Sequence, residues 1–98
     1  MRRAGVRVRV AERLTDLDVR VAASLRPHPR IGLIVPRYKH SAVERNRLKR
    51  RLRELLRTRL LPALPPLDLV VRALPTAYRA ELAALAGQLD RVRIAVDQ

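Results

Sequence analysis

The sequence contains no cysteine, phenylalanine or tryptophan, and only two tyrosines. Without cysteine, disulfide bonds, a thiol nucleophile and cysteine-based metal sites are excluded. No apolar run approaches the ~18 residues that a membrane-spanning helix needs, and Met1-Arg2-Arg3 is followed by no apolar signal core. We therefore expect a protein that stays in the cytoplasm and does not insert into a membrane.

Acidic residues are also scarce, at 9 against 22 Lys and Arg, which gives a net charge of +13. The 98 residues suffice for one small domain with one core, and the 48% apolar content argues against a disordered basic tail. A folded domain of this charge favours a polyanionic partner, with nucleic acid ahead of an anionic membrane surface.

The positive charge is concentrated in the middle of the chain. Residues 26–59 hold twelve basic residues against Glu44 and Glu54, whereas residues 60–98 hold four of each sign. Since twenty of the 22 basic residues are arginine, a coding bias is the competing explanation, but bias alone would not leave the last third neutral. The distribution indicates a basic binding surface.

Three apolar segments predict strands. Residues 19–25 alternate with Val19, Val21, Ala23 and Leu25 on the buried side, and residues 30–36 form a near-continuous apolar run, which suggests burial on both faces. The prolines at 26–29 favour a turn between them, so we expect a hairpin. Residues 67–74 predict the third strand.

Two helices are expected, one at 41–57 and one after the third strand. In the second, Tyr78, Leu82, Leu85, Leu89 and Val92 recur at the spacing of one helical face. Residues 1–18 stay undecided between a strand at 5–10 and a short helix after it. The order predicts an α+β domain in which helices pack against a small mixed sheet.

The helix at 41–57, SAVERNRLKRRLRELLR, carries the strongest signal. Ser41 and Glu44 have the spacing of a capping box, so the helix should begin at Ala42. Leu48, Leu52, Leu55 and Leu56 fall in one sector about 100° wide, which we interpret as the core face. The basic side chains lie opposite this face or on its flanks, with Lys49 nearest the apolar border.

This basic face has few acids to relieve the repulsion between its charges. External phosphates would supply the missing counter-charge, and arginine can engage a phosphate with two parallel hydrogen bonds. Asn46 adds a donor and an acceptor for a base edge or a 2′-hydroxyl. The alternative is a merely soluble helix whose arginine stems cover apolar borders.

At these residues the chain resembles a known family. Ala42-Val43-Glu44-Arg45-Asn46-Arg47-Leu48-Lys49-Arg50-Arg51-Leu52-Arg53-Glu54 is similar to the RNR helix of the bacterial ribonuclease P protein subunit, with its pattern AVxRNRxKRxxRE. The preceding RIGLIVPR, the following DLVVRALP and the last amphipathic helix extend the resemblance over residues 19–94.

The resemblance implies a function and a fold. Proteins of this family bind the catalytic RNA of ribonuclease P, and the holoenzyme removes the 5′ leader of precursor tRNA by hydrolysis that depends on Mg²⁺, with the catalytic groups on the RNA. The implied fold is a two-layer α+β sandwich of the ribonuclease P protein and ribosomal S5 domain 2 type. It contains a left-handed βαβ crossover, against the ~98% right-handed rule. The whole chain, 1–98, would be one such domain, with 1–18 an atypical, shortened N-terminal segment.

The motif positions that would contact RNA are Arg45, Asn46, Arg47, Lys49, Arg50 and Arg53, and Arg57 extends the same face. The chain departs from the family just before this helix, where Pro36-Arg37-Tyr38-Lys39-His40-Ser41 replaces the usual Ser-Lys-Lys-x-Gly-Asn. Arg37, Tyr38 and Lys39 are candidate contacts for phosphates or for the leader. The family's aromatic leader groove is depleted here, because residues 19–25 contain no ring.

No protein-based catalytic site is expected. The two histidines, His28 and His40, have no neighbouring ligands at metal spacing, and neither Glu44 nor Glu54 forms an acid–base pair with another group. Hence we expect no cofactor on the protein alone, and ribonuclease P RNA and precursor tRNA as partners. Two alternatives stay open: a non-enzymatic RNA-binding protein of ribosomal or nucleoid type, and a peripheral membrane binder, although the latter would need the leucine face that the core requires.

Overall fold

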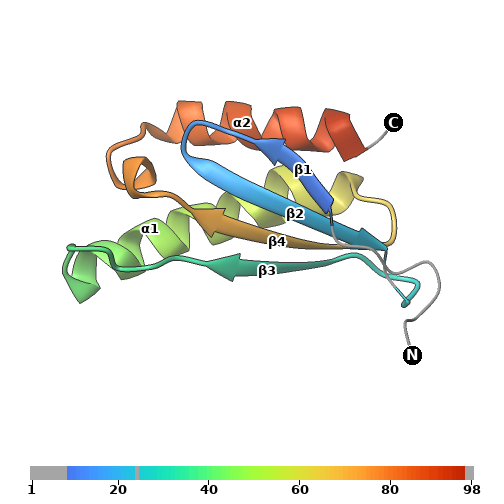
Figure 1. Cartoon of the computed structure of the whole chain (residues 1–98), viewed down its shortest axis with the longest axis horizontal. Helices are drawn as coiled ribbons and strands as arrows, with labels where there is room; N and C mark the ends of the chain where they lie inside the picture. The colour runs from blue at the N-terminus through green and yellow to red at the C-terminus, as the bar shows by residue number, and fades with distance from the viewer. Residues whose placement is uncertain (1–8, 24, 97–98) are drawn as a thin grey trace.

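A computed structural model describes residues 9–23 and 25–96 as a four-stranded sheet with two helices (Figure 1). In chain order the elements are β1 (Arg9–Arg13), β2 (Leu17–Ala23), β3 (Arg30–Ile34), α1 (Ala42–Leu55), β4 (Leu67–Ala73) and α2 (Leu82–Val96). Helix α1 continues through a wider turn, η1 (Leu56–Leu60), into a short 3₁₀ turn, η2 (Leu61–Ala63). A second 3₁₀ turn, η3 (Pro75–Tyr78), precedes α2.

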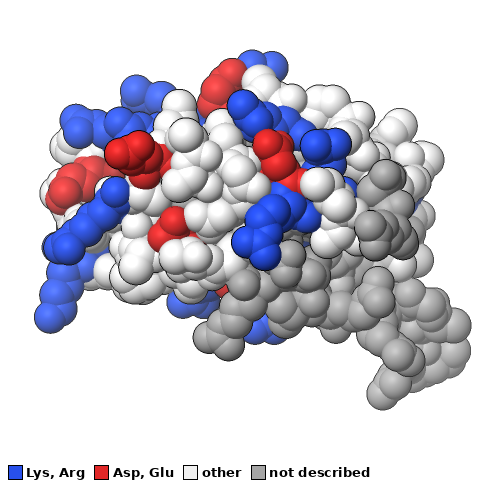
Figure 2. Space-filling model, turned by 90° about the horizontal axis from the view of Figure 1, so that it is seen from above, with Lys and Arg blue, Asp and Glu red and all other residues white. Residues whose placement is uncertain are grey.

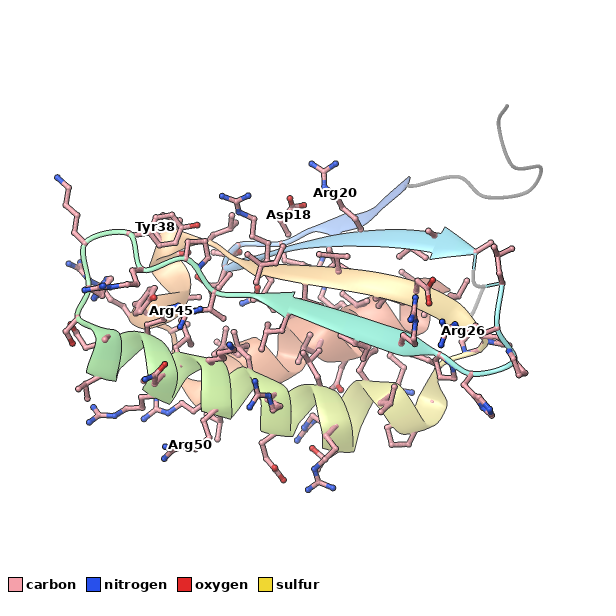
Figure 3. All side chains as sticks on the ribbon, turned by 90° about the horizontal axis from the view of Figure 1, so that it is seen from below. Asp18, Arg20, Arg26, Tyr38, Arg45 and Arg50 are labelled. Atoms are coloured by element: carbon pink, nitrogen blue, oxygen red, sulfur yellow. The ribbon has the colours of Figure 1, made fainter. Side chains whose placement is uncertain are left out.

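The sheet has the order β1-β2-β4-β3 and is mixed. Strand β2 is antiparallel to both β1 and β4, whereas β3 is parallel to β4. In Figure 1, β3 and β4 both run leftward with β4 above β3, and α1 lies behind the sheet, as the turned view in Figure 3 confirms. This arrangement makes the β3–α1–β4 crossover left-handed, as the family resemblance implied.

The expected hairpin between residues 19–25 and 30–36 is wrong. Strand β2 pairs along its whole length with β4, from Leu17 opposite Ala73 to Ala23 opposite Leu67, and β3 lies on the far side of β4. The proline-containing segment after Ala23 therefore carries the chain past one strand position. Strand spacings of ~4.8 Å make this a short distance for six residues. Its local turn signal could not distinguish a hairpin from this connection.

The predicted burial of both strands also needs correction. Strand β2 ends at Ala23, which is exposed although the alternation predicted it to be buried. Leu25 lies outside the strand and is 67% exposed. Strand β3 ends at Ile34 and is exposed or half-buried at every position, and Val35 after it is buried. Strand β3 lies at the edge of the sheet, where side chains have a neighbouring strand on one side only. A continuous apolar run in this strand therefore did not mean burial on both faces.

The core lies between one face of the sheet and the two helices. Alternate residues of β2 and β4 point into it, and the leucines of α1 meet them from the other side. Its principal members are Leu17, Val19, Val21, Leu48, Leu52, Leu55, Leu56, Leu69, Val71, Leu85, Leu89 and Val92. The predicted leucine face of α1 is thereby confirmed, and none of the described helices covers the opposite face of the sheet.

The last helix begins later than the apolar spacing predicted. Pro75 opens the 3₁₀ turn that contains Tyr78, and Leu82, the first residue of α2, is 51% exposed. Leu85, Leu89 and Val92 form the buried face as expected. Proline is favoured at the first position of a helical turn, so Pro75 begins a separate short turn before α2. The apolar spacing continues through both turns and therefore placed the start of the helix too early.

Within the undecided N-terminal region, the residues that the structure describes form β1 and a tight turn. The Leu14 N–H donates to the Leu17 carbonyl, and the buried Asp16 is held by Gln88 of α2. The Gln88 side-chain amide donates to an Asp16 carboxylate oxygen at 2.6 Å and accepts from the Asp16 backbone N–H at 3.0 Å. These bonds fix the β1–β2 turn against α2. Part of the predicted strand at 5–10 lies outside the described residues.

Candidate nucleic-acid interface

The start of α1 is closed by the predicted capping box. The Ser41 hydroxyl accepts from the Glu44 backbone N–H at 3.1 Å, and the Glu44 carboxylate accepts from the Ser41 backbone N–H at 2.9 Å. The Ser41 N–H and then the His40 ring lower the pKa of Glu44. This acid therefore serves the helix terminus and the loop before it.

We expect Ser41→Ala to lower the free energy of unfolding by about 1 kcal/mol, because the first turn of α1 loses a capping acceptor. For a domain of this size that corresponds to a fall of roughly 4–8 °C in melting temperature. Thermal melts followed by circular dichroism would measure it. Thr58→Ala is the control, because its hydroxyl only back-bonds to the Glu54 carbonyl. Equal melting temperatures for wild type and Ser41→Ala would contradict the role of the cap.

The outward face of α1 is strongly basic and largely unpaired. Four arginines, Arg47, Arg50, Arg51 and Arg53, are exposed, and their side chains make no hydrogen bond or ion pair with any other residue that the structure describes. Figure 3 shows Arg50 pointing away from the sheet. Arg57 pairs with Glu54 at 2.6 Å, which raises the pKa of its guanidinium, and Arg59 pairs with Asp90 of α2 at 3.0 Å. The predicted face is therefore present, with its charge relieved mainly at its C-terminal end.

The side of the molecule that carries α2 has a different character. Figure 2, seen from that side, shows acidic and basic side chains interspersed over the surface. This matches the neutral composition of residues 60–98. The unrelieved positive charge is thus a property of α1 and its surroundings.

Arg45 differs from the other basic residues of α1. Its Nε donates to the Val35 carbonyl at 2.8 Å, and the side chain is only half-exposed (Figure 3). A terminal nitrogen lies 3.5 Å from the Asn46 side-chain oxygen. Arg45 therefore joins the start of α1 to the segment after β3 and helps to orient Asn46, a structural use that the motif did not reveal.

The loop at 36–41 presents Arg37, Tyr38 and Lys39 beside the N-terminal end of α1. Tyr38 adopts a φ of 52°, the left-handed region that side chains rarely occupy, and its hydroxyl donates to the Ala73 carbonyl at 2.8 Å. Its ring is still 40% exposed. The Arg37 Nε lies 3.4 Å from the His40 carbonyl, and Lys39 is exposed. The three candidate contacts are therefore together on one turn.

An aromatic cluster holds this turn in place, and sequence reasoning missed it. The His40 ring stacks on the Tyr78 ring, with centroids 3.8 Å apart and planes 5° apart, and Tyr38 meets Tyr78 edge to face at 6.3 Å. The Tyr78 hydroxyl donates to the Pro36 carbonyl at 2.6 Å. The two tyrosines of the chain are thus in contact with one another. In the sequence, the only hint of this contact is that the chain has no other large aromatic residue. The cluster therefore attaches the turn before α1 to η3.

We expect the Tyr78 phenol to make the free energy of unfolding fall at alkaline pH. Burial raises its pKa above the usual value, so the folded state favours the neutral phenol. This stabilisation is present below the unfolded pKa of about 10 and disappears as the pH rises through the folded pKa. We expect Tyr78→Phe to lose about 1 kcal/mol at neutral pH, because the bond to Pro36 is gone, and to lose less than wild type on going to alkaline pH.

Urea unfolding at a series of pH values would measure this effect. Tyr38→Phe is the matched control, because it retains Tyr78 and should therefore retain the alkaline loss. An identical alkaline loss in wild type and Tyr78→Phe would show that Tyr78 is not the titrating group.

The uncovered face of the sheet forms a second surface near this turn. It carries Arg20 of β2, Val70 and Arg72 of β4, and Gly32 and Ile34 of β3. No aromatic side chain of the described strands lies on it. Asp18 and Asp68 lie on the same face and pair with Arg20 at 3.8 Å and with Arg30 at 3.5 Å. The face is therefore apolar at its centre and mixed in charge around it, with a small excess of arginine.

Other site types find no support in the described part of the chain. No three His, Asp or Glu side chains among the described residues are grouped so that they could hold a metal ion. The described helices include none that is long and apolar enough to cross a membrane. His40, predicted in a turn or exposed, lies half-buried in the turn at 37–40, stacked on Tyr78.

Comparisons with known proteins point to one family. The model of the ribonuclease P family matches residues 4–95. The ribonuclease P protein component of Acidothermus cellulolyticus is 40% identical over 84 residues, covering 86% of this chain and 70% of the relative. That of Streptomyces griseus is 44% identical over 90 residues, covering 91% and 73%.

Solved structures agree on the fold. The Staphylococcus aureus RNase P protein matches with a TM-score of 0.71 at 21% identity, over 89% of this chain and 77% of that one. The Thermotoga maritima RNase P protein matches with a TM-score of 0.68 at 23% identity, over 88% and 85%. With the capped basic RNR helix, the left-handed crossover and a family match along almost the whole sequence, this chain belongs to the bacterial ribonuclease P protein family, the protein component of the ribonuclease P holoenzyme.

Proposed function

We propose that this chain binds the RNA subunit of ribonuclease P through the outward face of α1 and assists removal of the 5′ leader from precursor tRNA in the cytoplasm. The observation that carries the proposal is the row of exposed arginines on α1 without partners among the described residues. Like charges at these spacings repel one another. Phosphates of a bound RNA would convert this repulsion into attraction.

Different side chains of α1 are proposed to contact different parts of the RNA. Arg47, Arg50 and Arg53 engage phosphates, each with a planar fork that matches two phosphate oxygens. Asn46 donates to or accepts from a base edge or a 2′-hydroxyl. Lys49 and Arg57 extend the positive face toward β3. Arg45 has mainly a structural role, because its hydrogen bond to the Val35 carbonyl holds the start of the helix in place.

Precursor tRNA is proposed to meet the other end of α1. Arg37 and Lys39 add positive charge beside the helix N-terminus, where the helix dipole also favours anions. The exposed ring of Tyr38 is available for stacking on a base. The uncovered sheet face continues this surface through Arg72 and through Arg20, whose 3.8 Å pair with Asp18 is weak enough to be exchanged for a phosphate. Its lack of rings favours contacts with the leader backbone over sequence-specific ones.

The chemical step is assigned to the RNA. By resemblance to the family, hydrolysis depends on Mg²⁺ held in the RNA, and the protein contributes positive charge where two RNAs approach one another. A general nucleic-acid-coating protein of ribosomal or nucleoid type is the competing function. Asn46→Ala distinguishes them, because selective loss of binding to ribonuclease P RNA, with binding to duplex RNA retained, supports the proposal.

The proposal predicts a steep salt dependence of binding to ribonuclease P RNA. Each phosphate contact contributes a slope of about −0.7 to −0.9 in log K against log salt, so several contacts give an overall slope steeper than about −3. Filter binding or fluorescence anisotropy between 50 and 300 mM salt, roughly the range over which such effects are large, would measure it. A nearly flat dependence would contradict phosphate-dominated binding.

A further inference from the structure

We propose that a groove between β3 and the C-terminal half of α1 receives one unpaired nucleotide of the bound RNA, with the base on an apolar floor and the phosphates on a basic rim. The inference rests on the proposed function and adds to it a base-binding site. Figure 3 looks at the molecule from the side of β3 and α1, the elements that border this groove.

The groove has the size and lining of a nucleotide site. Its volume is about 610 Å³, within the ~300–1,000 Å³ typical of small-molecule pockets. It is lined by two sets of side chains, one from β3 and the preceding turn and one from α1, η1 and η2. They are Pro29, Arg30, Ile31 and Leu33 in the first set, and Lys49, Arg53, Leu56, Arg57 and Leu61 in the second.

The floor consists of apolar side chains that the core does not fully cover. Ile31 and Leu33 point to the helix side of the sheet, yet both are only half-buried, and Leu61 is 36% exposed. The groove is the reason, since α1 leaves space beside the edge strand. When the flat face of a ligand covers partly exposed apolar surface at the bottom of a concavity, the free energy of the system falls.

The rim is positively charged on both sides. Arg30 stands on the strand side, and Lys49, Arg53 and Arg57 stand on the helix side. Lys49 and Arg53 have no side-chain partner among the described residues. Arg30 and Arg57 pair with Asp68 at 3.5 Å and Glu54 at 2.6 Å, but these pairs are exposed and therefore weak enough to be exchanged for phosphates.

The combination of floor and rim selects an unpaired nucleotide. A paired base in A-form RNA shows only its edge, so it cannot place its flat face on Ile31 and Leu33. An unpaired base can do so, and the guanidinium planes of Arg53 and Arg57 offer further stacking surface. Because β3 is an edge strand, alternate backbone N–H and C=O groups also point away from β4 and can bond to a base.

The groove is distinct from the uncovered sheet face. Ile31 and Leu33 lie on the helix side of β3, whereas Gly32 and Ile34 lie on the opposite side with Val70. A nucleotide in the groove therefore leaves the sheet face free for another strand. An acidic peptide added to the β3 edge is the competing occupant, which the experiment below distinguishes.

Methyl-labelled wild-type protein would be titrated with the four homotetramers of RNA and with an abasic oligomer of the same number of phosphates, and followed by NMR. We expect at least one homotetramer to shift the methyl signals of Ile31, Leu33, Leu56 and Leu61 in a saturable way, and the abasic oligomer to leave them nearly unchanged. Equal shifts with the abasic oligomer, shifts confined to Ile34 and Val70, or a response to oligoglutamate alone would each overturn the proposal.

A variant that fills the groove tests the affinity that the base contributes. We expect wild type to bind the preferred tetramer about tenfold more tightly than the abasic oligomer, within the range found for base stacking on proteins. Leu61→Trp should abolish this difference. Ile94→Trp is the matched control, since Ile94 lies on α2 and is 53% exposed, and it should keep the difference. A difference that survives in Leu61→Trp would also overturn the proposal.

Failure of this inference can be told from failure of the proposed function. If the groove is not used, wild type still binds ribonuclease P RNA with a steep salt dependence while the groove methyl signals stay unchanged. If the proposed function fails, that RNA binding is itself absent. The wild-type methyl shifts do not depend on any variant, so they decide the matter even if Leu61→Trp folds poorly.

Discussion

The double variant Arg50→Glu, Arg53→Glu is expected to bind ribonuclease P RNA at least about 100-fold more weakly than wild type at 0.15 M salt. One phosphate contact contributes roughly a factor of five at this salt concentration, and reversing two charges both removes two contacts and adds repulsion of similar size. Both side chains are exposed and outside the buried leucine face, Arg50 opposite to it and Arg53 on its flank, so the melting temperature should change little.

The matched control is Arg79→Glu, Arg91→Glu, which changes the net charge by the same amount in the neutral last third of the chain. Both of these arginines are exposed, and the control should lose much less affinity. Binding titrations together with circular-dichroism melts would give both quantities. Equal losses in the two double variants would mean that net charge alone governs binding, and loss of the melting transition would mean that the basic face has been misassigned.

The parts of the fold that sequence predicts well are the local ones. The capping box at Ser41 and Glu44 and the leucine face of α1 are set by residues within one or two helical turns of each other. Period-two alternation likewise identified the buried side of β2 at Val19 and Val21. These signals act over short distances, and so the sequence contains them almost completely.

Strand pairing could not be predicted in the same way. Whether residues 30–36 pair with 19–25 or with 67–74 depends on contacts between segments far apart in the chain, and the local proline signal favoured the wrong choice. The left-handed crossover is the clearest example. General rules make it rare, and only the family resemblance indicated it.

The candidate site shows the same division between local and distant information. Which side chains of α1 face outward followed from helical geometry. That Arg45 is held by Val35, and that His40 stacks on Tyr78, required the fold, because the partners come from different elements. The groove at β3 also required the fold, since it exists only because an edge strand and a helix leave space between them.

These distant contacts explain how a small domain presents a rigid basic surface. The aromatic cluster joins the turn before α1 to η3, and the Asp16–Gln88 pair joins the first β-turn to α2. The first ties the two connections that flank α1 and α2 to one another, and the second ties the sheet to a helix. A helix held in this way keeps its arginines in a constant arrangement, which reduces the entropy lost when RNA binds.

At low Mg²⁺, the wild-type protein is expected to increase processing of precursor tRNA by its matching ribonuclease P RNA by about tenfold or more. Two RNAs that approach closely repel one another, and a protein surface that supplies several positive charges can replace part of the cation atmosphere between them. At high Mg²⁺ the RNA alone should approach the same rate, because free cations then screen the phosphates. The cleaved bond should be the same with and without protein.

The measurement is single-turnover cleavage of end-labelled precursor tRNA over a series of Mg²⁺ concentrations, with protein concentration held above saturation. The Arg50→Glu, Arg53→Glu variant should give little stimulation at low Mg²⁺, whereas the Arg79→Glu, Arg91→Glu control should stimulate nearly as well as wild type. Stimulation by the same factor at every Mg²⁺ concentration would exclude charge compensation as the cause. Cleavage by rigorously purified protein without RNA would overturn the assignment of catalysis to the RNA, because the protein's part in the proposed mechanism is to bring together two strands that repel each other.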